Sequence, residues 1–314
     1  MNRVNAVIGH GLNGVFAVAP SAGGRLAFEL FRHPLRRGVV RPHEREAHAA
    51  AVRETAEVDG LSVTLYRWGD GERPVLYMHG WGSRGSRCAG LVPGLLRDGC
   101  TVLSYDAPGH GESRSRGNTV PRNRAIAALL QERYGPFHGI VGYSFGALGA
   151  FHAVKTGVVA SRLVVVSGPC EFGFLVEEYC RWMGLRPGLV PELRRRVETS
   201  LLPETGIWDL FSATDHPEAV TVPILVLHDE DDEVVPVAHA RRVVETYGDR
   251  AVLRTTRGRG HRRMLVHGPV IEEIRSFLRQ DTTPLRQDTT TGPGTGAHPG
   301  RPSPPSCSGT GSGD

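Results

Sequence analysis

The stretch GYSFG, residues 142 to 146, places a serine between two glycines where one sequence pattern changes into another. The residues before it, FHGIVGY (137–143), form a short apolar run of strand length, and those after it, ALGAFHAVKTG (147–157), read as a helix. A serine on a sharp strand-to-helix turn has an exposed hydroxyl, and the flanking glycines let neighbouring backbone come close. Ser144 is therefore a candidate nucleophile, which needs a base to take its proton.

Strand-like and helix-like segments alternate on both sides of this turn. The predicted strands are 61–67, 74–79, 100–106, 137–143, 162–167, 222–228 and 250–256. The predicted helices are 86–97, 121–134, 145–157, 237–247 and 268–279. Strands separated by helices favour a parallel sheet that is covered on both faces. We therefore expect the α/β class, with a doubly wound, mostly parallel sheet.

One interval, from Pro169 to Val220, contains no convincing strand. Its helix-like segments predict a helical cap inserted between two strands, at residues 169–221. The aromatic residues of this interval either pack the insertion onto the domain or line a substrate pocket. Trp182 and Trp208 are the predicted substrate-binding residues, because such pockets are lined mainly by apolar and aromatic side chains.

The base for Ser144 should be a histidine on a later loop. His261, in RGRGHRRML (257–265), follows the last predicted strand and precedes the last predicted helix. His79 and His110 are competitors, but both lie in glycine-rich loops before the serine. We therefore expect His261 to be the base.

The loop after strand 222–228 supplies candidates for the acid that orients the base. It contains Asp229, Glu230, Asp231 and Asp232. The acid fixes the histidine tautomer and stabilises the imidazolium ion. Asp232 is favoured, with Asp229 and Asp231 as alternatives, and the surplus acids are interpreted as solvated turn residues.

With these residues the chain resembles the α/β-hydrolase superfamily in its single-domain serine-hydrolase form, from about residue 58 to 279. The order serine, aspartate, histidine is that of the superfamily. HGWG (79–82) resembles its oxyanion loop. The resemblance implies that the backbone N–H groups of Trp81 and Phe145 bind the oxyanion.

Two further motifs extend the resemblance. YDAPGHGES (105–113) resembles the structural D-x-P-G-x-G-x-S turn, and HDEDDEVVP (228–236) resembles the H-G-x-x-D-x-x-V-P acid loop. The second alignment implies Asp232 as the acid and puts Asp229 where the family has glycine. Superfamily members that cleave carbon–halogen bonds or epoxides carry aspartate at the elbow, so Ser144 disfavours those reactions.

The composition limits the possible partners and the compartment. A net charge of +4 without a basic stripe gives no case for a nucleic-acid partner. Five widely spaced cysteines without a CxxC pair argue against a zinc site and a disulfide framework, and they favour a reducing, cytoplasmic compartment. We expect no metal and no organic cofactor. No apolar run approaches the ~18 residues of a membrane span. A secretory signal at the N-terminus is the less favoured alternative.

The chain divides into three predicted parts. Residues 1–57 are an N-terminal extension, interpreted as a mobile tail that leads into a short amphipathic helix near GRLAFELF (24–31). Residues 58–279 form the α/β domain with its cap. Residues 280–314 are rich in Gly, Pro, Ser and Thr and predict a disordered tail.

These features together predict a serine hydrolase that cleaves an acyl bond, with a carboxylic ester of small or medium size as the substrate. Two alternatives remain open. One is a thioesterase or acyltransferase that takes its acyl group from a carrier, whose acidic surface Arg84, Arg87, Arg262 and Arg263 would meet. The other is a non-catalytic ligand-binding protein of the same fold. The sequence leaves the oligomeric state undetermined.

Overall fold

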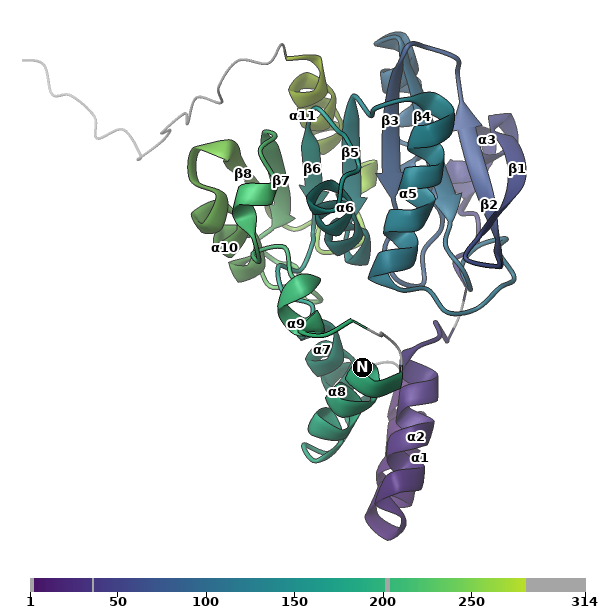
Figure 1. Ribbon diagram of the computed structural model, residues 1–314, viewed down its shortest axis with the longest axis vertical. Helices are drawn as coiled ribbons and strands as arrows, with labels where there is room; N and C mark the ends of the chain where they lie inside the picture. The colour runs from purple at the N-terminus through teal and green to yellow at the C-terminus, as the bar shows by residue number, and fades with distance from the viewer. Residues whose placement is uncertain (1–2, 36, 201–203, 281–314) are drawn as a thin grey trace, which may run out of the picture.

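The computed structural model describes residues 3–35, 37–200 and 204–280, and its centre is an eight-stranded sheet (Figure 1). In spatial order the strands are β1 (Val52–Val58), β2 (Leu61–Trp68), β4 (Cys100–Asp106), β3 (Arg73–Met78), β5 (Gly139–Tyr143), β6 (Leu163–Val166), β7 (Ile224–Asp229) and β8 (Ala251–Thr256). β2 pairs antiparallel with β1 and β4, and the remaining pairs are parallel. The predicted mostly parallel α/β sheet is confirmed.

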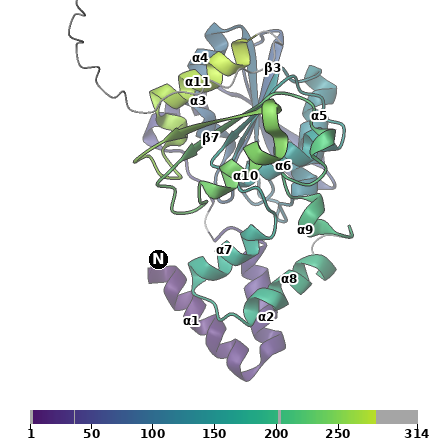
Figure 2. The same ribbon diagram turned by 90° about the vertical axis from the view of Figure 1, so that its left-hand side faces the viewer.

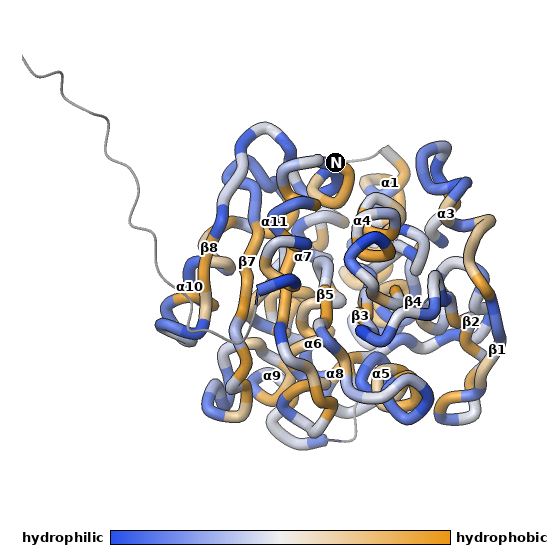
Figure 3. The backbone as a smooth tube through the Cα atoms, turned by 90° about the horizontal axis from the view of Figure 1, so that it is seen from above, coloured by the Kyte–Doolittle hydropathy of each residue, from blue (hydrophilic) through white to orange (hydrophobic). Residues whose placement is uncertain are grey.

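Both faces of the central strands are buried. Alternate residues of each strand point to opposite sides of the sheet. In β3, Leu76 and Met78 pack into one hydrophobic core, and Val75 and Tyr77 pack into the other. The first core includes residues of α5 (Val120–Tyr134), α6 (Phe145–Lys155) and α10 (Ala238–Tyr247), and the second includes residues of α4 (Val92–Arg97) and α11 (Gly268–Arg279). Figure 3 shows the central strands as mainly hydrophobic segments between these helices.

The insertion between β6 and β7 is helical, as the sequence predicts. It contains α7 (Phe174–Met183), α8 (Leu189–Ser200) and α9 (Ile207–Leu210). α8 buries Leu189, Leu193 and Val197, which are four residues apart and so lie on one face of the helix. The arginines of α8 lie outside this buried face of the helix. A heavily charged segment can therefore still pack as part of the cap.

The N-terminal extension contains the expected short helix near residues 24–31, but the residues before it form a second helix instead of a mobile tail. α1 (Arg3–Val18) and α2 (Pro20–Phe31) pack against each other, α1 contacts α7, and α2 contacts α8. Figure 2 shows the four helices grouped together on one side of the sheet. The approach is close at Gly9, where an added Cβ would lie 1.7 Å from the carbonyl oxygen of Met183. The cap is therefore built from two segments that are distant in sequence.

A short linker joins this helical cap to the sheet. It contains η1 (Pro42–Glu44) and α3 (Arg45–Ala50), and β1 then begins at Val52. Glu44 is fully buried; it accepts the backbone N–H of Arg41 at 3.1 Å and forms an ion pair with Arg87. Helices and strand β1 therefore precede residue 58, the predicted start of the α/β domain.

Short 3₁₀ helices complete the chain: η2 (Gly85–Cys88), η3 (Pro217–Ala219), η4 (Gly248–Arg250) and η5 (Met264–Val266). Within the described ranges, no helix has the length and apolar character needed to cross a bilayer. The predicted disordered tail lies outside the described residues, apart from Gln280.

Candidate active site

Ser144 lies between the end of β5 at Tyr143 and the start of α6 at Phe145. Its backbone is in a left-handed conformation, with φ 54° and ψ −123°, which is costly for a residue with a side chain and is found at functional turns. Gly146 is required here, because an added Cβ would lie 2.1 Å from the carbonyl oxygen of Met78. The turn therefore brings the serine close to the end of the neighbouring strand β3.

His261 connects the serine to an acid. It lies on the loop after β8, and its Nε2 is 3.0 Å from Ser144 Oγ. Its Nδ1 is 2.8 Å from Asp232 Oδ2. Because a carboxylate only accepts, Nδ1 carries the proton and Nε2 is free to accept the serine proton. The structure thus brings together the three residues that the sequence analysis selected.

Asp232 is buried at the end of the loop after β7. Its Oδ1 accepts the backbone N–H groups of Val234 and Val235, both at 2.9 Å. Burial alone would raise the pKa of Asp232, but the hydrogen bond and charge interaction with His261, together with these N–H groups, lower it below its usual value. The carboxyl group is therefore ionised at neutral pH.

The two alternative acids lie elsewhere in the loops. Asp229 accepts hydrogen bonds from the segment that precedes His261, and Asp231 accepts the backbone N–H of Gly258 at 2.8 Å. Neither has a described contact with the imidazole of His261. The geometry therefore favours Asp232 among the three carboxylates.

Tyr143 contacts the loop of His261, and this contact was not predicted from the sequence. Its hydroxyl donates to the backbone carbonyl of His261 at 2.9 Å, and the two rings are 5.4 Å apart between centroids. Burial raises the pKa of Tyr143, so the phenol stays protonated and remains a donor. Its position in GYSFG, directly before the serine, was visible in the sequence, but its partner 118 residues away was not.

The HGWG segment follows β3 at the same edge of the sheet, since Met78 of β3 is paired with Gly142 of β5. His79 fixes this segment: its Nδ1 lies 2.8 Å from the carbonyl oxygen of Gly80, and its Nε2 accepts the backbone N–H of Ala107 at 3.0 Å. Burial lowers the pKa of His79 to about 4, so the ring is neutral. His79 is thus a buried brace rather than a competing base.

Trp81 and Phe145 lie side by side near the serine. Their rings pack edge to face with centroids 5.6 Å apart, and Trp81 also contacts the ring of His110 at 5.2 Å. Within the described part of the chain, neither backbone N–H donates a hydrogen bond to another residue. Their use as oxyanion donors stays a prediction.

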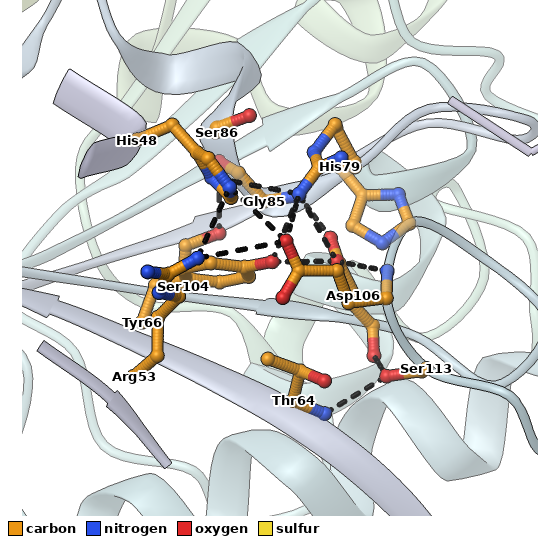
Figure 4. A network of polar contacts seen from close by, with 12 residues as sticks. His48, Arg53, Thr64, Tyr66, His79, Gly85, Ser86, Ser104, Asp106 and Ser113 are labelled. Carbon is orange, nitrogen blue, oxygen red and sulfur yellow. Dashed lines mark hydrogen bonds and ion pairs between the residues drawn. The ribbon is translucent and has the colours of Figure 1, made fainter. Parts of the chain in front are cut away.

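A buried polar network lies behind the HGWG segment (Figure 4). Asp106, at the end of β4, accepts the backbone N–H groups of Gly85 and Glu112 at 2.6 and 2.7 Å and the hydroxyl of Tyr66 at 2.7 Å. Arg84 lies 3.7 Å from the same carboxylate. The network ties the turn after β4 to η2, which agrees with the structural part that the resemblance implies for this turn.

The cap tryptophans have different surroundings. Trp208 packs against Phe172, with centroids 5.5 Å apart, lies 4.0 Å below the guanidinium of Arg194, and donates a hydrogen bond to Glu198. Trp182 is 45% exposed on α7. The contacts of Trp208 hold the cap together, and contact of either residue with a substrate stays a prediction.

The arginines considered for carrier binding fall into two groups. Arg84 is buried, with Glu112 at 3.1 Å, and Arg87 is paired with the buried Glu44. Arg262 and Arg263 are exposed. Only the second pair is available to an acidic surface. Among the described residues, no group of three or more His, Cys, Asp or Glu side chains is arranged to hold a metal ion.

A comparison with known families adds independent information. The sequence profile of the Alpha/beta hydrolase family matches residues 75–273, which is more than half of the chain. The chain belongs to the Alpha/beta hydrolase family. The match includes the HGWG segment, the serine turn and both loops that carry Asp232 and His261.

The individual proteins that the chain resembles share limited identity with it. The dihydrolipoyllysine-residue acetyltransferase component of the acetoin cleaving system of Cupriavidus necator is 32% identical over 155 residues, which are 48% of this chain and only 40% of that protein. Alpha/beta hydrolase domain-containing protein 17B of Xenopus laevis is 24% identical over 218 residues, covering 67% of this chain and 68% of the relative. An esterase from Exiguobacterium antarcticum superposes with a TM-score of 0.56 at 16% identity, over 73% of this chain and 100% of that one. At such identity the likeness shows the fold alone.

Proposed function

We propose that this alpha/beta hydrolase is a serine hydrolase that cleaves an acyl bond, with a carboxylic ester of small or medium size as its substrate. The observation that carries the proposal is the bridging position of His261, at 3.0 Å from Ser144 Oγ and 2.8 Å from Asp232 Oδ2. This arrangement is the one that activates a serine hydroxyl in acyl transfer.

In the proposed reaction, Ser144 Oγ attacks the ester carbonyl carbon while His261 Nε2 takes the hydroxyl proton. The negative charge that develops on the carbonyl oxygen is bound by the backbone N–H groups of Trp81 and Phe145. The imidazolium then gives its proton to the departing alcohol, which leaves an acyl-enzyme. Water attacks this ester as His261 takes its proton, and the acid is released as the proton returns to the serine.

Two electrostatic features support this sequence of steps. Asp232 is ionised and buried next to His261, so it stabilises the imidazolium that forms in each half-reaction. Ser144 immediately precedes α6, and the positive end of a helix dipole favours an anion at this place. Together they stabilise both charges of the tetrahedral intermediate.

The choice of ester size is based on the cap. The cap insertion follows β6, at the edge of the sheet that carries Ser144, so it limits what reaches the serine. Arg84 and Arg87 are occupied by internal ion pairs, which supports a small ester over an acyl group on a carrier. However, α1 exposes Val7 and Val18, at 73% and 88%, so a lipid substrate must be included in the test.

The test compares kcat/KM for short p-nitrophenyl esters, emulsified triolein and acyl-coenzyme A thioesters, with Ser144→Ala as the background for each. We expect the short esters to be preferred and the variant to be inactive on all three. If a thioester is preferred by more than about a hundredfold, which is equivalent to about 2.7 kcal/mol of transition-state free energy, the protein is a thioesterase rather than an esterase. Preference for triolein would indicate a lipase rather than an esterase for small esters.

A further inference from the structure

Asp229 is a fully buried carboxylate at the end of β7 that takes no part in the contacts between serine, histidine and acid. Four donors surround it. Its Oδ1 accepts the backbone N–H groups of Asp231 at 3.1 Å and Gly260 at 2.9 Å. Its Oδ2 accepts the hydroxyl of Thr256 at 2.6 Å and the backbone N–H of Arg259 at 3.0 Å. The four lone-pair positions of the carboxylate are therefore all used.

The donors belong to one functional segment. Thr256 is the last residue of β8, and Arg259 and Gly260 are the two residues directly before His261. Asp229 thus joins the end of β7 to the whole loop that presents the imidazole. The other end of that loop is held by Tyr143, whose hydroxyl donates to the backbone carbonyl of His261.

We propose that Asp229 is a positioning residue that sets the place of His261 through the backbone of residues 259 and 260. The proposal rests on the proposed function, because it assigns Asp229 a part in the same site. Asp232 fixes the ring of His261, and Asp229 fixes the backbone from which the ring extends.

A carboxylate is needed at this position for a physical reason. Among the described residues, the surroundings present four hydrogen-bond donors and no cation within hydrogen-bond distance, so only a group with four acceptor sites satisfies them. Burial alone would raise the pKa of Asp229, but these hydrogen bonds lower it, and the group stays charged. Asparagine has the same shape, but its N–H₂ group would face at least one backbone N–H and leave that donor unsatisfied.

The test uses Asp229→Asn, with Asp231→Asn as the matched control two residues away. Asp231 is exposed and accepts one backbone N–H, which an asparagine oxygen can still accept. We expect Asp229→Asn to lower kcat by about 10- to 100-fold with KM nearly unchanged, since displacement of a catalytic group by about 1 Å can cost about 10²-fold. Asp231→Asn should change kcat by less than about threefold.

A second readout does not depend on the substrate. In the wild-type protein the proton between His261 Nδ1 and Asp232 should give a downfield proton resonance in NMR, assigned by its loss in His261→Ala. We expect Asp229→Asn to broaden or shift this resonance and Asp231→Asn to leave it in place. A purely structural part for Asp229 would lower the melting temperature but leave the resonance and kcat unchanged, and that result would overturn the proposal.

Thr256→Val is a second test of the proposal if Asp229→Asn does not fold. It removes one donor to Asp229 and leaves the carboxylate and its three backbone contacts in place. A fall in kcat of about 3- to 10-fold is expected, and unchanged kcat with an unchanged resonance would contradict the proposal. Failure of the proposed function is a separate outcome, because Ser144→Ala would then keep its turnover whatever the result for Asp229.

Discussion

Asp232 lies between two histidines and is within hydrogen-bond distance of only one of them. Its Oδ2 is 2.8 Å from His261 Nδ1 but 3.5 Å from His228 Nε2, which is instead 2.7 Å from the carbonyl oxygen of Val235. The carboxylate therefore has one close imidazole partner, and its charge is directed at the ring that contacts Ser144. A substitution of Asp232 therefore tests its part as the acid.

We expect Asp232→Asn to lower kcat by about 10⁴-fold, because an amide in this place favours the wrong tautomer of His261. The variant should fold, since asparagine can still accept the backbone N–H groups of Val234 and Val235. Steady-state kinetics at neutral pH gives the answer. If kcat falls less in Asp232→Asn than in Asp229→Asn, then the assignment of Asp232 as the acid is wrong.

Ser144, Asp232 and His261 could be selected from the sequence because each lies in the turn or loop that follows a predicted strand. Carboxyl ends of parallel strands meet at one edge of a sheet, so a serine, an acid and a histidine in these loops are expected to lie close together. The parts played by Tyr143 and Asp229 could not be predicted. Each depends on a hydrogen bond to a segment more than 25 residues away, and no local pattern indicates such a partner.

At the scale of elements, α1 shows how packing overrides local propensity. Residues before the short helix near 24–31 were interpreted as a mobile tail, and glycine inside a helix costs about 1 kcal/mol relative to alanine. Gly9 allows the helix to approach α7 so closely that its Cα lies against the backbone of Met183, whereas Gly11 faces open space. The burial of Leu12 and the contacts of α1 with α2 and α7 support the helix.

These two glycines give a matched pair of variants. Gly9→Ala should destabilise the N-terminal helices, because the new Cβ would lie 1.7 Å from the carbonyl oxygen of Met183. Gly11→Ala meets no atom within 4 Å and should stabilise α1 by about 0.5–1 kcal/mol. Hydrogen exchange of the α1 amides measures both effects. Equal protection in the two variants would show that α1 does not pack against α7 as described.

Most strands and helices of the sheet domain could be predicted from their apolar patterns, and their bounds agree with the structure to within a few residues. β1 was missed, because VRETAEV (52–58) is charged and mostly exposed, and it is a strand only through its pairing with β2. The packing of the N-terminal helices on the cap was missed for a similar reason. It depends on contacts between segments about 170 residues apart, such as Asn13 with Gly184.

In the molecule as a whole, buried histidines couple folding to pH, among them His79, His110 and His152. Burial is the main cause that lowers the pKa of His79 and His152 to about 4 and that of His110 to about 3. Unfolded histidines titrate near 6.5, so between the two values the unfolded chain binds more protons. The free energy of unfolding therefore rises with pH in this window and falls as the pH drops from about 6.5 toward 4.

His152 isolates one part of this effect, because it lies against Phe211 and outside the contacts of Ser144. Each such histidine contributes about 1.4 kcal/mol per pH unit within the window. We expect His152→Leu to reduce the slope of unfolding free energy against pH, between pH 6 and 5, by about that amount. Urea unfolding of both proteins at several pH values measures it. Identical slopes would show that His152 is not held neutral by the fold.

The proposed function requires that Ser144 is a nucleophile activated by His261. The most direct measurement is reaction of the purified protein with a fluorophosphonate, followed by mass spectrometry of its peptides. We expect one phosphonyl group on the peptide that contains Ser144, a reaction slowed by orders of magnitude in His261→Ala, and no label in Ser144→Ala. Labelling at another serine, or labelling of Ser144→Ala at the wild-type rate, would contradict the account.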